Sequence, residues 1–477
     1  MGIKYDKAVF SVCAVAEILG SHSTLRDDIT SIVTDSREAE SGALFVAIKG
    51  ERFDGHDYIS QAISKGAVAV VAERMPDGLE QAERVILCES SLDALGKIAS
   101  AYKSRIHPKT VAVTGSVGKT TTKEFVYAVA SANYAAHKTE GNFNNEIGMP
   151  LSVLTMPETT QVCVLEMGMS GLGEISHLTN TAKPDIAIIT NIGNSHIENL
   201  GSRENICKAK LEIVEGVPED GWVILNADEP MLFAQKGKLN HNLLFVSLEN
   251  PLADYRALNI REYEDSTEFD LVAGKRVVTN VRIPTIGRHN VYDATYAFAV
   301  GILLGMSDED IKRGLMSFRN TGMRQNIYEY GGITIIEDCY NAGPESMKAA
   351  VEVLKRLADK TGCRAVAVLG DMRELGDYSK QLHMEIGTLV ASRHISNLVT
   401  FGREAENIAL GAINHAMKPE NISVNTNTEN VKNVAKIIFD MLGTGGAVLF
   451  KASRAVRLER VIDELKKLID ESINSQA

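Results

Sequence analysis

The sequence has few cysteines, and it has no apolar run long enough to span a bilayer. Its six cysteines are scattered without any CxxC pair, at Cys13, Cys88, Cys163, Cys207, Cys339 and Cys363. This pattern argues against a zinc site or a disulfide framework and favours reduced thiols in or near hydrophobic cores. The N-terminal segment MGIKYDKAVF also lacks the long apolar stretch of a signal peptide. We therefore expect a cytoplasmic protein without a membrane partner.

Positive charge is scarce relative to negative charge. The chain has 50 Lys and Arg residues against 62 Asp and Glu residues, which gives a formal net charge of −12. An acidic surface disfavours non-specific attraction to nucleic acid and to anionic lipid, so neither is an expected partner. A small substrate that carries phosphate is still compatible, because a basic pocket can form inside an acidic protein.

Apolar residues make up 44% of the 477 residues, which is enough to fill several hydrophobic cores. This length predicts about two to four domains. Short β-rich segments alternate with helical segments, which is typical of mostly parallel sheets covered by helices. We predict an α/β protein with an N-terminal α/β domain (1–88), a central domain with a mostly parallel sheet (89–321) and a C-terminal Rossmann-like domain (322–477).

The clearest motif is TGSVGKTTT (114–122), which follows a buried-strand pattern and opens a helical one. Gly115 and Gly118 allow a tight turn whose backbone amides approach phosphate oxygens at the helix N-terminus. Lys119 would neutralise the β- and γ-phosphates, and Thr120 would offer its hydroxyl to Mg²⁺. The motif predicts an ATP site formed by Gly115, Ser116, Gly118, Lys119, Thr120 and Thr121.

The loop departs from the usual Walker pattern at Val113, where that pattern has glycine. A motor protein or a GTPase switch is therefore a poorer match. A protein that hydrolyses ATP only to change shape remains an alternative from a different functional class. A fortuitous strand–turn–helix with a surface lysine is the structural alternative, and the GKT sequence directly after a strand disfavours it.

Three further residues are candidate metal ligands, and the sequence supports them to different degrees. Glu166 ends the VCVLEMG strand, and ligands gather at the carboxyl ends of strands in such sheets. Mg²⁺ prefers carboxylate oxygens, so a ligand is favoured there over a structural ion pair. His196 follows the PDIAIIT strand, and as a single histidine it is equally compatible with an ordinary structural role. For Lys210, the sequence pattern taken by itself predicts an ordinary lysine on the surface of a helix.

Motifs along nearly the whole chain resemble the Mur ligase family, the ATP-dependent amide ligases of peptidoglycan precursor synthesis. The matching segments are TGSVGKTTTKE (114–124), TEGNFNNEIGMPL (139–151), EMGMSGLGEI (166–175), TNIGNSHIENLGS (190–202), AKLEI (209–213), GRHNVYDA (287–294), Arg324, EDCYNAGPESM (337–347), LGDMRELG (369–376) and KASR (451–454). They occur in the family's order. The segment TDSREAESGALFVAIKGERFDGHDYI (34–59) resembles the uridine-nucleotide-binding domain of two of its members.

Within the family, the chain is most similar to members that add D-alanyl-D-alanine. NNEIGMPL follows the P-loop helix, YNAGPESM resembles the usual YNANP segment, and the DNPR segment of the diaminopimelate-adding members is absent. The resemblance implies ATP and Mg²⁺ as cofactors, and UDP-MurNAc-tripeptide and D-Ala-D-Ala as small-molecule substrates of a monomeric enzyme. Another Mur-type ligase, or a folylpolyglutamate-type ligase that adds a different amino acid, is the alternative within this class.

The resemblance also implies roles for individual residues. Catalytic roles fall on Lys119, His196, Lys210 and Arg324. Magnesium ligands would be Thr120, Glu166, His196 and, if it is carbamylated, Lys210. Residues that face the nucleotide would be Asn290, Arg324, Asp338, Tyr340 and Asn341. The uridine-diphosphate site would include Ser36, Arg37, Asp54, Gly55 and His56, and the sugar-peptide loop would include Asn142, Asn144, Asn145 and Glu146.

Two positions depart from the family pattern: Gly343 stands where asparagine is usual, and Ala452 stands in a KASR segment that is usually KGSR. We interpret Gly343 as a residue that suits a turn before Pro344. The implied reaction has two steps. A carboxylate first takes the γ-phosphoryl group of ATP, and an amine then displaces phosphate from the acyl phosphate to form an amide.

Overall fold

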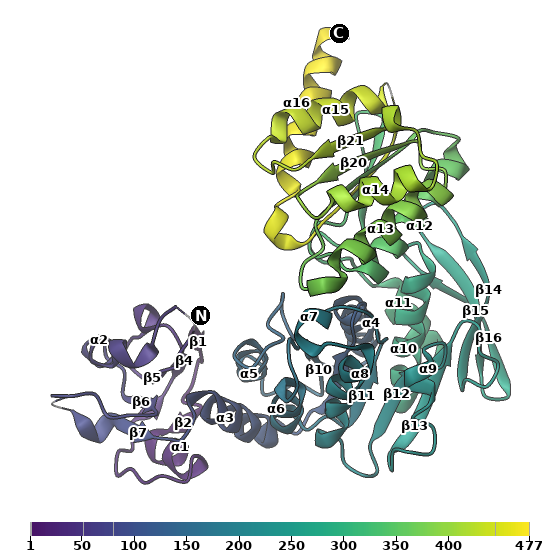
Figure 1. Cartoon of the computed structure of the whole chain (residues 1–477). Helices are drawn as coiled ribbons and strands as arrows, with labels where there is room; N and C mark the ends of the chain where they lie inside the picture. The colour runs from purple at the N-terminus through teal and green to yellow at the C-terminus, as the bar shows by residue number, and fades with distance from the viewer. Residues whose placement is uncertain (1, 51, 80, 444, 477) are drawn as a thin grey trace.

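The computed structural model describes residues 2–50, 52–79, 81–443 and 445–476. Three separate α/β units follow one another along the chain, each built around its own larger sheet (Figure 1). The predicted fold class, an α/β protein of three domains, is therefore confirmed. The predicted boundaries at residues 88 and 321 stay predictions. Within the described residues, no helix has both the length and the apolar character needed to cross a membrane.

The N-terminal sheet has five strands in the order β1-β4-β5-β6-β7. They are β1 (Gly2–Lys4), β4 (Ser31–Val33), β5 (Ala43–Val46), β6 (Ala69–Ala72) and β7 (Val85–Leu87). β1 is antiparallel to β4, and the other pairs are parallel. This unit also contains the small sheet of β2 (Phe10–Ser11) and β3 (Asp28–Ile29), and helices α1 (Val12–Ile18) and α2 (Ile59–Ser64).

The central sheet has nine strands in the order β16-β15-β14-β13-β12-β11-β8-β10-β9. They are β8 (Lys109–Thr114), β9 (Ala136–Lys138), β10 (Val162–Glu166), β11 (Ile186–Ile189), β12 (Trp222–Asn226), β13 (Asn242–Ser247), β14 (Tyr255–Glu262), β15 (Thr267–Ala273) and β16 (Arg276–Ile283). The neighbouring strands β9, β10, β8, β11, β12, β13 and β14 all pair parallel. β14, β15 and β16 form an antiparallel extension that was not predicted from the sequence.

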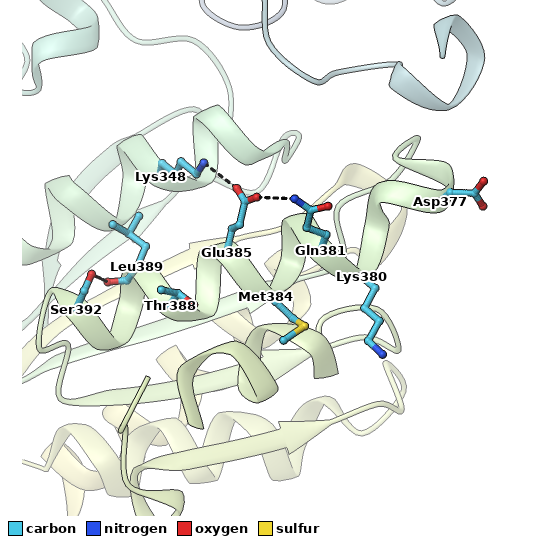
Figure 2. Close-up of a pocket in the computed structure, with 9 residues that line it drawn as sticks. All are labelled: Lys348, Asp377, Lys380, Gln381, Met384, Glu385, Thr388, Leu389 and Ser392. Atoms are coloured by element: carbon cyan, nitrogen blue, oxygen red, sulfur yellow. Dashed lines mark hydrogen bonds and ion pairs between the residues drawn. The ribbon is translucent and has the colours of Figure 1, made fainter. Parts of the chain in front are cut away.

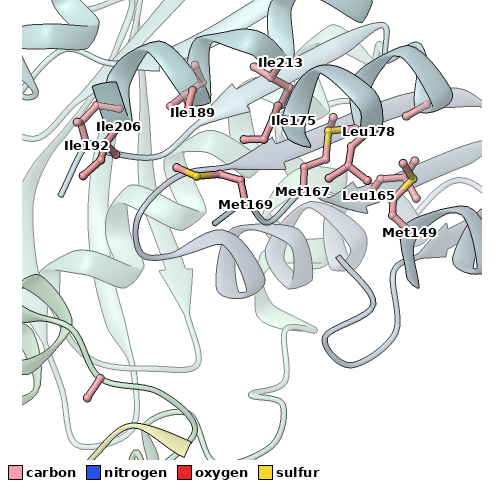
Figure 3. Packing of buried hydrophobic residues seen from close by; sticks show 14 of the residues in the cluster. Met149, Leu165, Met167, Met169, Ile175, Leu178, Ile189, Ile192, Ile206 and Ile213 are labelled. Carbon is pink, nitrogen blue, oxygen red and sulfur yellow. The ribbon is translucent and has the colours of Figure 1, made fainter. Parts of the chain in front are cut away.

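The helices of the central unit cover both faces of its sheet. They are α4 (Lys119–Ser131), α5 (Gly148–Leu154), α6 (Glu174–Ala182), α7 (Ile197–Leu200), α8 (Arg203–Leu211), α9 (Pro230–Phe233), α10 (Arg288–Leu303) and α11 (Asp308–Met316). Alternate strand residues point to opposite faces. Val111 and Val113 of β8 pack with Phe125 of α4 on one face. Leu165 of β10 packs with Leu178 of α6 on the other, as Figure 3 shows. Burial of both faces explains the near-continuous apolar strands.

The C-terminal sheet has six strands in the order β17-β18-β22-β19-β20-β21. They are β17 (Asn326–Tyr330), β18 (Ile333–Glu337), β19 (Ala365–Gly370), β20 (Asn397–Phe401), β21 (Ile422–Asn425) and β22 (Gly446–Lys451). Only β17 pairs antiparallel with its neighbour. The helices of this unit are α12 (Pro344–Thr361), α13 (Ser379–Ser392), α14 (Glu406–Asn414), α15 (Val431–Leu442) and α16 (Glu459–Gln476).

Helix α3 (Ser91–Ile106) connects the N-terminal unit to the central one. It packs on α1 and β6 of the first unit and on α5 and α6 of the second. In Figure 1 the N-terminal sheet lies to one side, whereas the C-terminal unit sits above the central sheet. The carboxyl ends of the central strands therefore face the C-terminal unit, and this junction is where a ligand site is expected in an open α/β sheet.

Candidate active site

The glycine loop, residues 115–118, connects β8 directly to α4, as the sequence predicted. Gly115 has φ of +148° and Gly118 has φ of +85°, a backbone region that residues with a Cβ rarely adopt. A Cβ on Gly115 would lie 1.9 Å from Oγ1 of Thr190, the residue that follows β11, so only glycine fits there. The helix begins at Lys119, and its first free amides lie at the edge of the sheet where an anion can bind.

Lys119 lies at the mouth of this loop. Its ammonium donates hydrogen bonds to the carbonyls of Gly115, at 2.8 Å, and Ser116, at 3.4 Å. Burial lowers the pKa of Lys119, while the carboxylate of Glu166 acts to raise it and the nearby Arg324 guanidinium lowers it further. The Lys119 ammonium and the Arg324 guanidinium, which come from different units, therefore place positive charge in the same part of the site. This suits a strongly anionic ligand such as a nucleotide triphosphate.

Glu166 ends β10 beside this loop, and its carboxylate is held in place from two sides. Thr120 donates to Oε2 at 2.8 Å, and Asn144 donates to Oε1 at 2.7 Å. The buried ammonium of Lys123 lies 3.9 Å from Oε2 and donates to the carbonyl of Thr139 at 2.7 Å. Glu166 is only 2% exposed, so its charge is fixed beside the glycine loop. Thr120 and Asn144, both predicted site residues, thus contact the predicted metal ligand.

His196 caps α7 with a left-handed backbone, at φ of +64°. Its Nδ1 lies 2.6 Å from Oε2 of Glu374, a residue of the C-terminal unit. The contact with His196 lowers the pKa of Glu374, and burial opposes that shift. No role was predicted for Glu374 from the sequence, although the matching segment LGDMRELG contains it.

Lys210 is not a surface lysine, so the prediction from its helical pattern alone is wrong. Its side chain is 1% exposed, because α8 packs against α6, α7 and α9 and buries the stripe that also carries Ile206 and Cys207. In the described part of the chain it makes no hydrogen bond or ion pair. Burial lowers the pKa of Lys210 well below its usual value, and the Lys119 cation adds to that shift. The surroundings of Lys210 therefore disfavour the charged form of its amine.

The predicted adenine-side residue Asn290 lies at the start of α10 and touches the link between the central and C-terminal units. Its amide donates to the Ile286 carbonyl at 2.7 Å and to Gln325 Oε1 at 3.2 Å. Nε2 of His289 lies 2.6 Å from the same Gln325 oxygen. Gln325 has φ of +45°, which marks a strained link directly after Arg324. Asn290, the predicted nucleotide-side residue, is therefore in direct contact with the link between the two units.

The C-terminal unit contributes a basic and aromatic group to the site. The Arg324 guanidinium lies over the Tyr340 ring, 4.2 Å from its centroid, in cation–π geometry. Asp338 is paired with the buried ammonium of Lys451 at 2.6 Å, and Lys451 also donates to the Asn341 carbonyl at 3.1 Å. Lys451 was missed as a site residue, although the KASR segment contains it.

These residues line one cavity of about 980 Å³ between the central and C-terminal units. The predicted residues that line it are Ser116, Gly118, Lys119, Thr120, Thr121, Asn142, Asn144, Asn145, Glu166, His196, Asn290, Arg324, Asp338, Tyr340 and Asn341. Gly115, Glu146 and Lys210 are not among the lining residues. No group of three or more His, Cys, Asp or Glu side chains that could hold a metal occurs within the described ranges. A magnesium site here would therefore need hydroxyl, carbamate, phosphate or water oxygens as further ligands.

A second, open hollow lies on α12 and α13 (Figure 2). In it, Glu385 already accepts hydrogen bonds from Lys348 and Gln381, each at 3.2 Å. It contains neither the glycine loop nor any of the predicted site residues. The cavity at the glycine loop is therefore the candidate active site.

The predicted uridine-diphosphate residues lie elsewhere, in the N-terminal unit around α2. Ser36 donates to Gln61 of that helix at 2.8 Å, and Arg37 forms an exposed ion pair with Asp35. Asp54 lies 2.6 Å from His56 Nδ1, and His56 accepts the Glu73 amide at 2.9 Å. Gly55 leaves no room for a Cβ, which would lie 2.7 Å from the Ile48 nitrogen. None of these residues lines the interdomain cavity.

The two departures from the family pattern have different explanations. Gly343 has φ of −145° and ψ of 166°, an extended conformation open to any residue before proline, so the interpretation as a turn glycine is wrong. Its α-carbon faces the 193–198 segment, where a Cβ would meet Ser195 Oγ at 3.4 Å. Ala452 fits because it packs against Gly370, where an added Cβ would come within 2.6 Å of the Ala452 methyl.

Asp293 of α10 is a cavity residue that the sequence analysis missed. It lies one turn after Asn290 on the same helix face, so the matching GRHNVYDA segment carried a signal for it. It accepts a hydrogen bond from Thr122 at 2.6 Å and is 4% exposed. Burial raises the pKa of Asp293 from 3.8 to about 7, and the Thr122 contact only partly opposes this. A carboxyl group that prefers its proton therefore lies under the glycine loop.

Asp293→Asn should make the protein more stable at pH 8, by about 2 to 4 kcal/mol. The folded state binds the Asp293 proton more tightly than the unfolded state, so the parent loses stability as pH rises from about 4 to about 7. Asparagine removes this loss and still accepts from Thr122. Urea unfolding at pH 5 and pH 8 measures the effect, with the exposed Asp220→Asn as control. Equal gains at both pH values would contradict the assignment.

Comparison with known proteins covers the same three units. The chain matches the models for the Mur ligase family catalytic domain over residues 28–103, the Mur ligase middle domain over 113–301 and the Mur ligase glutamate ligase domain over 323–454. It is 40% identical over 445 residues to the UDP-N-acetylmuramoyl-tripeptide--D-alanyl-D-alanine ligase of Bacillus subtilis (strain 168), which covers 92% of this chain and 93% of that protein.

Solved structures show the same similarity. A crystal structure of MurF from Acinetobacter baumannii has a TM-score of 0.86 at 29% identity, covering 96% of this chain and 99% of that one. The MurF ligase from Thermotoga maritima in complex with ADP has a TM-score of 0.83 at 34% identity. This match covers 92% of this chain and 98% of that one. Sequence and fold therefore agree along nearly the whole chain.

Proposed function

Because the chain belongs to the Mur ligase family, we propose that it joins D-alanyl-D-alanine to UDP-N-acetylmuramoyl-tripeptide and converts ATP to ADP and phosphate. The observation that carries the proposal is the single cavity in which the glycine loop, Lys119 and Glu166 of the central unit meet Arg324 of the C-terminal unit. The named activity of the Bacillus subtilis relative supports the choice of substrates.

The reaction begins with the terminal carboxylate of the tripeptide. One of its oxygens attacks the γ-phosphorus of ATP, the bond from that phosphorus to the bridging oxygen breaks, and ADP leaves. The amine of D-Ala-D-Ala then attacks the acyl carbon of the resulting acyl phosphate. The tetrahedral intermediate expels phosphate, the nitrogen loses a proton, and an amide remains.

The protein accelerates these steps by positioning and by electrostatic stabilisation. The amides at the start of α4 and the Lys119 ammonium neutralise the phosphate oxygens during transfer. Arg324 approaches the same space from the C-terminal unit, stacked on Tyr340. Because the cavity lies between two units, their closure also excludes water from the reactive acyl phosphate.

The residues at the glycine loop fit a magnesium ion. Glu166 and Thr120 present hard oxygen donors in direct contact with one another, and His196 lines the same cavity. When bound, the ion would supply positive charge for the phosphate oxygens of ATP. We propose that Thr120, Glu166 and His196 hold it, together with Lys210 if its amine is carbamylated.

The carbamate proposal rests on the surroundings of Lys210. The neutral amine is the form of lysine that reacts with CO₂, and burial shifts Lys210 toward that form. The product is an anionic oxygen ligand. An unmodified ammonium in the same place would repel the neighbouring Lys119. Carbamylation would replace the repulsion between the Lys210 and Lys119 ammonium groups with an attraction between the Lys210 carbamate and the Lys119 ammonium.

We further propose that Ser36, Arg37, Asp54, Gly55 and His56 bind the uridine-diphosphate end of the substrate in the N-terminal unit. The reacting carboxylate of the same molecule would lie in the interdomain cavity. The substrate would then extend past α3, which packs on both units.

Phosphate release with each substrate omitted in turn tests the function. With ATP, UDP-MurNAc-tripeptide and D-Ala-D-Ala present, we expect phosphate and an equal amount of UDP-MurNAc-pentapeptide. Omitting the tripeptide should abolish phosphate release, and free glutamate in place of D-Ala-D-Ala should give no product. Phosphate release that persists without either substrate would favour an ATPase that only changes shape. Product with another amino acid would favour a different ligase of this class.

A further inference from the structure

The central segment that carries His196 is contacted by two carboxylates of the C-terminal unit. Glu374 lies 2.6 Å from His196 Nδ1, and its backbone carbonyl accepts the Glu198 amide at 3.3 Å. Glu345 at the start of α12 accepts from the backbone and side-chain nitrogens of Asn194, at 3.0 and 2.8 Å. Residues 194–198 are therefore held from across the interdomain cavity.

The loop that carries Glu374 is fixed within its own unit. The Met372 amide donates to Nε2 of the buried His383 at 3.0 Å, and the Arg373 amide donates to Ser453 Oγ at 3.1 Å. Glu374 itself has φ of +64°, a conformation that residues other than glycine adopt only when their surroundings enforce it. The carboxylate of Glu374 is thus presented to His196 by an anchored and strained loop.

The contact determines which nitrogen of His196 can bind a ligand. A carboxylate beside Nδ1 favours a proton on that atom, and the lone pair then remains on Nε2. Histidines that bind metals almost always donate their other ring N–H to a carboxylate or a carbonyl, which fixes both tautomer and ring orientation. In this protein the carboxylate that lies 2.6 Å from Nδ1, without the alignment of a hydrogen bond, comes from a different structural unit than the ring.

We propose that Glu374 is a positioning residue that orients His196 for magnesium, so that the metal site of the central unit is complete only when the C-terminal unit is docked. This inference rests on the proposed function, in which His196 is a magnesium ligand. Undocking removes the carboxylate from His196 and weakens the metal site. Phosphoryl transfer is thereby confined to the closed form, in which the acyl phosphate is shielded from water.

Mn²⁺ binding to the full-length protein with ADP, measured by the electron paramagnetic resonance of free Mn²⁺, tests the proposal. Glu374→Gln keeps the shape of the side chain and removes its charge, so the dissociation constant of Mn²⁺ should rise by about 10- to 100-fold. Glu374→Asp keeps the charge and suits the left-handed backbone, so it should lose less affinity. Glu352→Gln, on an exposed ion pair of α12, is the matched control and should leave the constant unchanged.

Two further variants separate the explanations. Glu345→Gln alters the other cross-domain contact without touching His196, and its loss of affinity should be much smaller. Equal losses in Glu345→Gln and Glu374→Gln would show that docking alone matters and would overturn the proposal. The proposal would also be overturned if Glu374→Gln left the dissociation constant of Mn²⁺ unchanged while His196→Ala lost Mn²⁺ binding. If His196→Ala binds Mn²⁺ as the parent does, the error lies in the metal assignment of the proposed function.

Discussion

Lys119→Ala should reduce turnover by about 10²- to 10³-fold or more while the protein stays folded. In the proposed ATP site, this ammonium is the group beside the glycine loop that would bring a full positive charge to the β- and γ-phosphates. Its loss should lower kcat strongly, because charge on the transferred phosphoryl group is greatest in the transition state. Phosphate release and pentapeptide formation measure the effect, and thermal unfolding checks the fold.

The matched control for this variant is Lys109→Ala. Lys109 begins the same strand, β8, but it lies at the opposite end of the sheet, half exposed, in an ion pair with Asp185 at 2.9 Å. Its removal should leave turnover close to that of the parent. Lys119→Met keeps most of the apolar stem and should be as inactive as Lys119→Ala. Activity near the parent level in either Lys119 variant would contradict the assignment of the loop to ATP.

Lys210→Ala should also lose activity, by about 10²- to 10³-fold, and short carboxylic acids such as acetate should restore part of it. The alanine removes the amine that would carry a carbamate, and a carboxylic acid can place an oxygen anion in the space that is left. Lys208→Ala is the control, because Lys208 is exposed on the same helix. Parent-like activity in Lys210→Ala would remove this residue from the site. Loss without any rescue would argue for a role other than a carbamate.

Lys210→Met should increase the stability of the protein in CO₂-free buffer at pH 7. Burial lowers the pKa of Lys210 in the folded state, whereas the unfolded lysine keeps its usual pKa near 10.5. The unfolded state therefore binds more protons between these values, and the parent loses stability as pH falls below about 10. Methionine removes that dependence, so its advantage should be larger at pH 7 than at pH 10. Urea unfolding at both pH values measures it.

The sequence was sufficient for the glycine loop because the loop is local. The strand that precedes it, its glycines and the helix that follows are contiguous, so a short pattern determines Gly115, Gly118 and Lys119 together. The same holds for Glu166, whose strand was visible as an apolar run. The strands β14 to β16 escaped prediction because they are half exposed and carry polar residues at alternate positions, unlike the buried parallel strands.

Features that depend on contacts between distant segments were out of reach. The burial of Lys210 follows from three helices that pack around α8, and no pattern within α8 records them. The pairing of His196 with Glu374 joins residues of two different units. Gly343 shows the reverse error, because a local turn was inferred where the backbone is extended. Motif matches contained Glu374, Asp293 and Lys451, but their partners became visible only in the fold.

The contact of Asn290 with Gln325 has a thermodynamic consequence. Gln325 lies in the chain segment about which the C-terminal unit would swing, and Asn290 is the residue expected to meet the adenine. If nucleotide binding shifts the angle between the units, reciprocity requires that the angle shift nucleotide affinity by the same factor. A substitution at Gln325 should therefore change how tightly ADP is retained after each turnover.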